Sequence, residues 1–386
     1  MGKRIKLGII YSYDENWIGG TYYYQNLIRS FSLLPDERKP HLIILGNQAS
    51  FNSIEGLHYP YISFYALPSN EKVIYKSLIR RIKQRLFSFL PQRRKNIPLP
   101  DIDVLFHPSE ITAPFPVKKH LYWIPDFQEV YLPQYFSLAY LHFRKQTQLE
   151  LLTAEHHIIF SSFDALSDFK RLYPAATTNC YVVNFAVFHP DFSQLSLSLL
   201  REKYNISESQ YFYVPNQFWK HKNHITVLKA ALTLKNHYGN NFQLLFSGKE
   251  SDFRNPEYIN ELKEYVTENG LNETVRFLGF IERTDQLCLM NHALAIIQPS
   301  LFEGWSTVVE DVKAINQNII VSDLGVHREQ LGEQAFYFKT HDEILLAKIM
   351  FTFLSKDIPR PSFDYSNRLA NFGNDFMQLI DSIVQV

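Results

Sequence analysis

The chain has 386 residues, with 39 Lys or Arg against 39 Asp or Glu, so its formal net charge is zero, and 46% of it is hydrophobic. This balance argues against a nucleic-acid-binding protein, and no apolar run approaches the roughly 18 residues of a membrane-spanning helix. Two cysteines are too few for a disulfide framework or a cysteine metal site, which fits a reducing cytoplasm. The length exceeds one ordinary hydrophobic core and predicts two domains.

The first half alternates short apolar runs with longer amphipathic segments, a pattern typical of βαβ units around a parallel sheet. The run 5–11 leads directly into a polar loop, so we interpret it as the first strand rather than as a signal peptide. The expected strands are 5–11, 41–45, 104–107, 121–124, 157–161 and 181–185. The expected helices are 23–33, 75–90, 140–155 and 162–172.

One of these helices is strongly basic. Nine Lys or Arg residues and no Asp or Glu stand between Lys72 and Lys95, around an apolar face with helical spacing. Two interpretations stay open: a helix packed on the core with a solvated basic face, or a helix lying on an anionic membrane surface. The second interpretation would place the protein at the inner face of a membrane.

A second alternating series follows the polar stretch 186–206, where we place the domain boundary. Its expected strands are 211–215, 243–247, 275–277, 293–298, 319–321 and 335–338. Its expected helices are 225–236, 256–269, 283–291, 307–315 and 342–354. The predicted domains are 1–190 and 207–364, and segment 365–386 is expected to be a helix that packs back on the first domain. Two doubly wound α/β domains of this kind would face the carboxyl ends of their strands into a common cleft, where ligands bind.

The most informative segment is 298–311, which follows an apolar strand and opens a helix. A helix start offers free N–H groups that suit a phosphate. Thr307 and Glu310 fit a Thr-x-x-Glu capping box, so we interpret Glu310 as a helix cap. Glu303, beside Gly304 in a loop, has no evident packing role, and Asp311 would lie in the first helical turn near the same cleft.

Segment 299–311 resembles the Glu-x7-Glu signature of the retaining family-4 glycosyltransferases, which have the GT-B fold of two facing Rossmann-like domains. Other segments are similar to that family in the same order: 213–224, 276–280 and 319–329 in the second half, and more loosely 17–20, 124–128 and 161–170 in the first. The resemblance implies an enzyme that transfers a hexose, such as mannose or rhamnose, from a nucleotide-diphosphate sugar to a glycan or lipid-linked saccharide.

The resemblance also implies roles for single residues. Glu303 would bind the hydroxyls of the donor sugar, and Asp311, which stands where the family has its second glutamate, would accept from the ribose. Lys222 would neutralise the departing diphosphate together with backbone N–H groups of this loop. The other donor-binding residues would be Asn216, Gln217, Lys220, Gly279, Phe280, Gly304, Trp305, Ser306 and Thr307. An Arg usual in the family is replaced near Asn216, so Lys220 or Arg328 could take its place.

In the first domain, Gly19 and Gly20 would let backbone N–H groups approach the phosphates, because glycine tolerates close approach and positive φ. Many relatives have a His near the sugar where this chain has Pro125, which leaves Asp126 as the acceptor-side candidate. A turn cap explains Asp126 equally well.

No metal or other cofactor is expected. Asp101 and Asp103 match the Asp-x-Asp pattern of a metal site. They directly precede an apolar strand, so we interpret them as the residues that lead into this strand. Three alternative functions stay open: a nucleotide-sugar 2-epimerase of the same fold, a catalytically inactive partner subunit, and a solute-binding protein, which would normally carry an export signal.

Overall fold

A computed structural model describes residues 3–14, 18–67, 100–111, 117–238, 242–252 and 254–385. The chain divides into two compact units. The first unit comprises Met1–Phe127, Phe136–Ala186 and Arg368–Val386, and the second comprises Gln128–Tyr135 and Val187–Asn367. The basic helix expected between Lys72 and Lys95 lies outside the described residues, as does Trp17.

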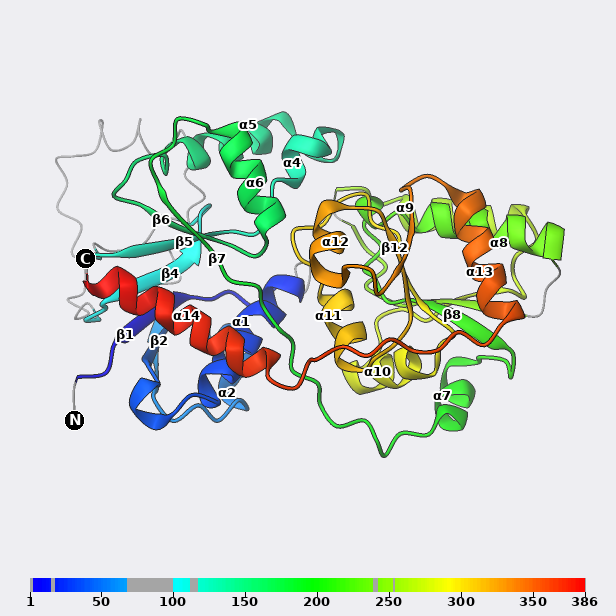
Figure 1. Ribbon diagram of the computed structural model, residues 1–386, viewed down its shortest axis with the longest axis horizontal. Helices are drawn as coiled ribbons and strands as arrows, with labels where there is room; N and C mark the ends of the chain where they lie inside the picture. Colours follow the sequence, from blue (N-terminus) through cyan, green and yellow to red (C-terminus); the bar gives the residue numbers. More distant parts are fainter. Residues whose placement is uncertain are drawn as a thin grey trace. The chain divides into compact units, whose positions relative to one another are not determined.

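The first unit is built on a parallel seven-stranded sheet of order β3-β2-β1-β4-β5-β6-β7. Its strands are β1 (Lys6–Ile10), β2 (His41–Gly46), β3 (Ile62–Ala66), β4 (Val104–Pro108), β5 (His120–Ile124), β6 (His157–Phe160) and β7 (Asn179–Val182). Its described α-helices are α1 (Ile18–Ser32), α2 (Gln48–Glu55), α5 (Leu138–Leu149), α6 (Phe163–Leu172) and α14 (Arg368–Gln385). Figure 1 shows these elements in chain order.

The C-terminal helix α14 packs against α1 within the first unit (Figure 1). Gly373 permits the close approach, because a Cβ at this position would lie 2.7 Å from the Ser30 carbonyl oxygen. Aromatic rings fill the seam, with Phe376 edge-on to Phe31 at 5.7 Å between centroids. The last element of the chain therefore completes the core of the first unit.

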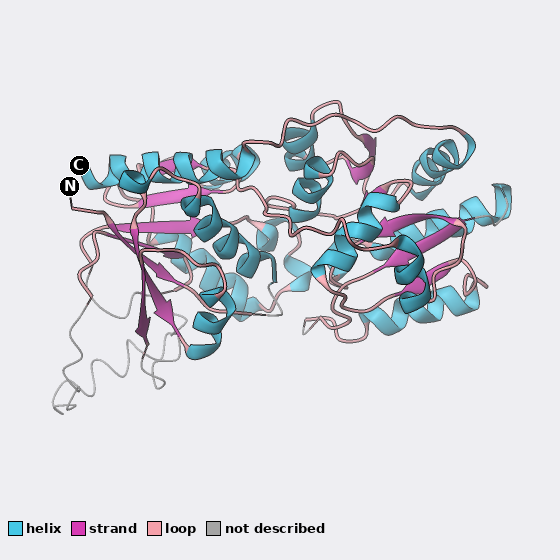
Figure 2. Ribbon diagram, turned by 90° about the horizontal axis from the view of Figure 1, so that it is seen from below, coloured by secondary structure: helices cyan, strands magenta, loops and turns pink. Residues whose placement is uncertain are grey.

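The second unit holds a parallel six-stranded sheet of order β10-β9-β8-β11-β12-β13. Its strands are β8 (Gln210–Val214), β9 (Phe242–Phe246), β10 (Val275–Phe277), β11 (Ile296–Gln298), β12 (Ile319–Ser322) and β13 (Phe336–Phe338). Its α-helices are α4 (Gln128–Tyr131), α7 (Leu197–Tyr204), α8 (His224–Tyr238), α9 (Tyr258–Glu268), α10 (Arg283–His292), α11 (Thr307–Ala314), α12 (Gly325–Leu331) and α13 (Glu343–Ser355). Figure 2 distinguishes the helices from the strands.

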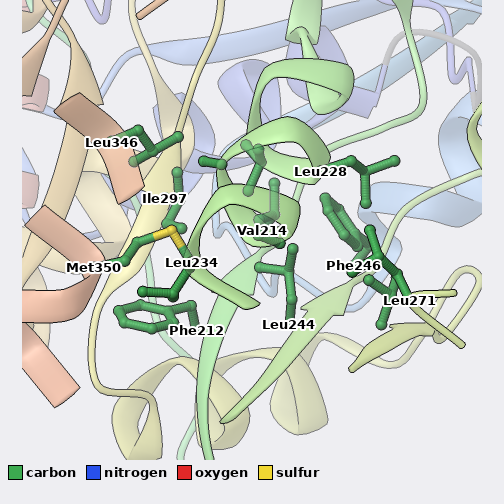
Figure 3. Close-up of a cluster of buried hydrophobic side chains, with 14 of the residues drawn as sticks. Phe212, Val214, Leu228, Leu234, Leu244, Phe246, Leu271, Ile297, Leu346 and Met350 are labelled. Atoms are coloured by element: carbon green, nitrogen blue, oxygen red, sulfur yellow. The ribbon is translucent and has the colours of Figure 1, made fainter. Parts of the chain in front are cut away.

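Strand alternation divides the core of the second unit into two layers, because successive side chains of a strand point to opposite faces. Phe212 and Val214 of β8 pack with Leu228 of α8 and Met350 of α13 on one face of the sheet (Figure 3). Their neighbours Tyr211 and Tyr213 pack on the other face with side chains of α10 and α11. Helices on both faces explain why these strands are almost continuously apolar.

The prediction of two doubly wound α/β domains is confirmed. Several elements differ from the expectation: β7 begins at Asn179 rather than at 181, and the polar stretch 186–206, for which no helix was predicted, contains α7. Leu200 of α7 is buried in the core of the second unit, which gives this short helix its support. β3, α2 and α12 were not predicted. β3 is an edge strand without a continuous buried run, and α12 has only seven residues.

Candidate functional site

The loops after three neighbouring strands of the second unit converge. β8, β11 and β12 are adjacent and parallel, so their carboxyl ends lie at one edge of the sheet. Loops at this edge are where ligands bind in doubly wound sheets. They carry Lys222 after β8, Glu303 after β11 and His327 after β12.

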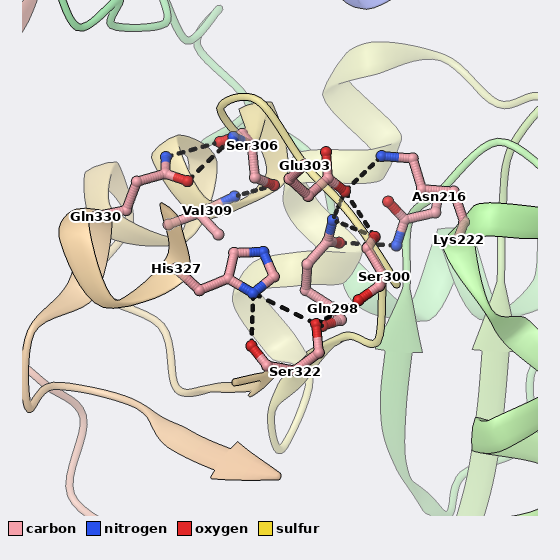
Figure 4. Close-up of polar contacts among 10 residues, drawn as sticks. All are labelled: Asn216, Lys222, Gln298, Ser300, Glu303, Ser306, Val309, Ser322, His327 and Gln330. Carbon is pink, nitrogen blue, oxygen red and sulfur yellow. Dashed lines mark hydrogen bonds and ion pairs between the residues drawn. The ribbon is translucent and has the colours of Figure 1, made fainter. Parts of the chain in front are cut away.

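Glu303 is held by three hydrogen-bond donors (Figure 4). Its Oε1 lies 2.6 Å from Lys222 Nζ, 2.7 Å from Gln298 Nε2 and 2.6 Å from Ser300 Oγ. The side chain of Glu303 is only 9% exposed and that of Lys222 17%. Burial by itself raises the pKa of the Glu303 carboxyl, but Lys222 and Ser300 together outweigh it and lower the pKa. Glu303 is therefore an oriented carboxylate.

A short turn aims Lys222 at this carboxylate. The turn Lys220–Lys222 ends at Asn223, which has φ +57° in the left-handed region that asparagine tolerates. The Asn223 amide donates to the carbonyls of Pro299, at 3.0 Å, and Thr340, at 2.7 Å. The Leu301 N–H donates to the His221 carbonyl at 2.8 Å. These bonds tie the turn to the Glu303 loop, so the two charges keep their separation.

The loops after β8, β9 and β10 are also tied together. Asn216, expected to bind the donor, is buried and donates to Gln298 Oε1 at 2.8 Å. Gly248, which was not predicted, has φ +152°, and a Cβ there would overlap the Asn216 carbonyl. The Gly248 N–H donates to the Gly279 carbonyl at 2.9 Å, and Gly279 has φ +69°. The overlap with Asn216 requires glycine at 248, and the left-handed φ favours glycine at 279.

The start of α11 corrects one prediction. Ser306, not Thr307, is the N-cap residue, and its hydroxyl accepts from the Val309 N–H at 3.3 Å. The expected capping box between Thr307 and Glu310 is therefore wrong by one residue. Glu310 is fully buried and instead accepts from Lys313 Nζ at 2.9 Å and from Gln330 Nε2 at 3.1 Å.

Gln330 of α12 clamps the backbone of this helix start. Its Oε1 accepts from the Ser306 N–H at 3.0 Å, and its Nε2 donates to the Ser306 carbonyl at 3.1 Å (Figure 4). The N–H and the hydroxyl of Ser306 are therefore both engaged within the protein. A phosphate could therefore meet the Ser306 N–H only by displacing Gln330.

Asp311 is buried and contacts two basic side chains, Arg283 and His189. Arg283 binds both of its carboxylate oxygens, with NH1 2.7 Å from Oδ2, and His189 Nε2 lies 2.9 Å from Oδ1. Burial alone raises the pKa of Asp311, but Arg283 and His189 outweigh it and lower the pKa. The side chain is only 1% exposed. A ribose hydroxyl would reach Asp311 only beside or in place of these two partners.

The remaining candidates of the second unit have other partners or surroundings. Lys220 Nζ lies 3.4 Å from Glu261 on α9, and Arg328 pairs with Asp323 at 2.7 Å. Gln217 is half-buried, and Phe280 is exposed at the end of the β10 strand.

Three candidates belong to the first unit. Gly19 and Gly20 lie in the first turn of α1, and neither uses the positive φ that glycine tolerates. Their N–H groups instead belong to a helix start.

Asp126 follows β5, and its carbonyl accepts from Arg144 at 2.9 Å. Asp103 accepts from the Lys6 N–H at 2.7 Å and Asp101 pairs with the Lys6 side chain, which supports their interpretation as a strand entry.

Sequence reasoning missed five residues that shape the site. Gln298 and Ser300 stand inside the segment already singled out, and their polarity at a strand end was the available signal. Arg283, His189 and Gln330 carry no such signal, because each meets its partner from more than 20 positions away in the chain.

Comparison with known proteins finds a family model that matches part of the second half of the chain. Residues 198–370 match the family model described as "Glycosyl transferases group 1". The O-antigen chain mannosyltransferase RfbU of Salmonella typhimurium is 24% identical over 220 residues. This alignment spans 57% of the chain and 56% of that protein, so little more than half of the relative is matched.

Solved structures show the same fold over nearly the whole chain. A glycosyltransferase from Rickettsia africae has a TM-score of 0.66 at 15% identity, covering 100% of this chain and 98% of that one. Anabaena Alr3699/HepE, solved in complex with UDP and glucose, has a TM-score of 0.63 at 14% identity, covering 99% and 96%. The predicted GT-B fold is thereby confirmed. The match of residues 198–370 to the group 1 model supports the predicted resemblance to glycosyltransferases, whereas the family-4 subdivision stays a prediction.

The described residues were also compared with what a membrane span and a metal site require. Across the described segments, no helix combines the length and apolarity needed to cross a bilayer. In the same segments, no group of three or more His, Cys, Asp or Glu side chains is placed to hold a metal ion.

Proposed function

We propose that this chain, whose residues 198–370 match the group 1 glycosyltransferases, is a retaining hexosyltransferase that uses a nucleotide-diphosphate sugar. The observation that carries the proposal is the buried Lys222–Glu303 pair at the carboxyl ends of β8 and β11. This pair is a cation and a carboxylate side by side at the sheet edge where doubly wound folds bind ligands, which supports roles in holding the diphosphate and the sugar. The similarity to a mannosyltransferase favours mannose, and rhamnose is the second candidate.

The mechanism follows from the chemistry of the leaving group. A nucleoside diphosphate departs readily once its growing negative charge is stabilised, and preorganised cations and N–H groups do this best in a site shielded from water. Lys222 would leave Glu303 to meet the diphosphate, joined by N–H groups near Gly304 and Trp305. Glu303 would then accept hydrogen bonds from sugar hydroxyls. The acceptor hydroxyl attacks on the face that the diphosphate leaves, which retains the anomeric configuration without a covalent enzyme intermediate.

The proposal extends to the acceptor and to the location in the cell. The relative's name, an O-antigen chain mannosyltransferase, favours a glycan or lipid-linked saccharide acceptor in polysaccharide biosynthesis. The basic segment 72–95 would then contact the anionic inner face of the membrane from the cytoplasm. Asp126 is the acceptor-side candidate of the first unit, Asp311 and Phe280 would bind ribose and base, and no metal is required.

A panel of nucleotide sugars tests the proposal. Purified protein is incubated with GDP-mannose, dTDP-rhamnose or UDP-glucose, and release of the nucleoside diphosphate is measured with and without saccharide acceptors. We expect one donor to turn over and NMR of the product to show a retained anomeric configuration. Inversion would refute the retaining mechanism, and the absence of both binding and turnover would refute the enzyme.

The substitution Lys222→Gln tests whether Lys222 stabilises the departing diphosphate. Loss of an electrostatic contact to the leaving group costs about 100- to 1,000-fold in kcat. The matched control is Lys263→Gln, because Lys263 also bonds a glutamate at 2.6 Å but lies against Glu250. Equal activity losses in the two variants would contradict the assignment.

A further inference from the structure

His327 is a buried histidine that the mechanism above does not use. It lies in α12, the helix after β12, and its side chain is completely enclosed. Figure 4 shows the imidazole beside the Glu303 loop, held from below by Ser322. The ring therefore belongs to the same group of strand-end loops as Lys222 and Glu303.

A single hydrogen bond fixes which ring nitrogen carries the proton. His327 Nδ1 lies 2.7 Å from the Ser322 carbonyl oxygen. A carbonyl can only accept, so Nδ1 must donate. In the neutral imidazole the other nitrogen, Nε2, then has a lone pair and no hydrogen. His327 presents a hydrogen-bond acceptor at Nε2.

This acceptor has no partner. Among the described residues, none hydrogen-bonds Nε2, although the atom is buried. Buried polar atoms are almost always paired, and leaving one unpaired is costly, so an exception in a ligand-binding region points to a group that binds there. The partner must be a hydrogen-bond donor, such as a hydroxyl.

The electrostatic surroundings keep His327 neutral and place it near the sugar-binding carboxylate. Burial lowers the pKa of His327, and although Glu303 raises it, the net shift is downward. Glu303 and Lys222 both act on the ring, one attracting and the other repelling a proton. An uncharged acceptor beside a carboxylate suits a polyhydroxylated ligand, because each can take a different hydroxyl.

We propose that His327 Nε2 accepts a hydrogen bond from one hydroxyl of the transferred hexose and so contributes to donor-sugar specificity. This inference rests on the proposed function and adds a second acceptor to Glu303. Because Nε2 is enclosed in the ligand-free protein, the hydroxyl enters only when a neighbouring side chain moves. Lys222 is the side chain that the mechanism already moves, from Glu303 to the diphosphate.

Two substitutions distinguish the roles of the two ring nitrogens, Nδ1 and Nε2. His327→Asn keeps a donor near the Nδ1 position for the Ser322 carbonyl and removes the acceptor. His327→Gln places an amide near the Nε2 position and is the conservative rescue. Calorimetry measures the Kd of each variant for a nucleotide sugar and for its nucleoside diphosphate: GDP-mannose with GDP, dTDP-rhamnose with dTDP, and UDP-glucose with UDP.

We expect His327→Asn to bind the nucleoside diphosphate as wild type does and to bind the preferred nucleotide sugar about tenfold more weakly, the value of one neutral hydrogen bond. Donors lacking one hydroxyl locate the contact. Wild type should lose about tenfold for one deoxy position, the Asn variant should lose nothing further there, and the Gln variant should recover part of the affinity.

The outcomes distinguish this inference from the proposed function. If wild type binds and turns over a nucleotide sugar, yet every deoxy donor weakens binding equally in wild type and in His327→Asn, His327 makes no sugar contact and only this inference fails. Equal weakening of nucleoside diphosphate and nucleotide sugar would also overturn it, because it indicates a structural role or a buried water. If wild type binds no nucleotide sugar, the proposed function and this inference fall together.

Discussion

Replacing Gln330 by Leu tests whether α12 holds the start of α11 in its ligand-binding shape. The substitution keeps most of the side-chain volume and removes the bonds to the Ser306 N–H, the Ser306 carbonyl and the Glu310 carboxylate, which measure 3.0, 3.1 and 3.1 Å. Each buried group left unpaired costs about 1–3 kcal/mol, and partial relaxation of the loop reduces the sum to about 3 kcal/mol. We expect the segment 303–309 to become mobile and nucleotide-sugar affinity to fall about tenfold or more.

The control is Gln317→Leu, a buried glutamine before β12 rather than after it. Gln317 Nε2 donates to the carbonyls of Met290, Asn291 and Ala293 at 2.8, 3.0 and 3.1 Å. Its loss should reduce the free energy of unfolding by a similar amount, about 3 kcal/mol, while affinity stays near wild type. The two glutamines lie at opposite ends of β12, so stability is matched while the distance from the site differs.

Urea denaturation, calorimetry with the preferred nucleotide sugar, and amide hydrogen exchange of the segment 303–309 give the three readouts. The exchange measurement needs no activity and so tests the clamp by itself. The reasoning is refuted if exchange in this segment is unchanged in Gln330→Leu, or if both variants lose affinity equally. Should Gln330→Leu fail to fold, Gln330→Glu retains the acceptor for the Ser306 N–H and replaces it.

Three further predictions concern stability. Removing one partner of the Lys222–Glu303 pair leaves a buried charge, at a cost of about 3–5 kcal/mol. The double variant Lys222→Gln with Glu303→Gln should therefore be more stable than the sum of the two single losses predicts. Urea unfolding of the two single variants and the double variant measures this coupling, and additive losses would contradict it. Gly248→Ala should destabilise by about 3 kcal/mol or more because of its positive φ and its overlap with Asn216, whereas Gly56→Ala, which meets open space, should be near neutral by thermal melting. Burial lowers the pKa of His224 to about 3, below the ordinary value near 6.5, so the unfolded state binds more protons than the folded state at mildly acidic pH. The free energy of unfolding should therefore fall below pH 6.5, by about 2 kcal/mol at pH 5. His224→Phe should flatten this part of the pH–stability curve, and an unchanged slope would contradict the prediction.

The sequence predicted the fold well because its signals are local. The apolar runs of β1, β8 and β9 are buried on both faces, and nearly continuous hydrophobicity is the mark of a central parallel strand. The edge strand β3 lacks this mark and was missed. The second half was also readable because motif 299–311 is contiguous, and Glu303 could be singled out as a carboxylate without a packing role.

Only the tertiary structure decided how the site is held. Ser306 rather than Thr307 caps α11, a one-residue difference set by backbone geometry that the composition of the segment does not reveal. Asp311 meets Arg283 and His189, and Ser306 meets Gln330, from positions far along the chain. The lone pair of His327 depends on one carbonyl oxygen in the preceding loop. The sequence singles out the candidate residues, whereas their hydrogen-bond partners and the proton position on His327 depend on the parallel strands, which bring distant loops to one edge of the sheet.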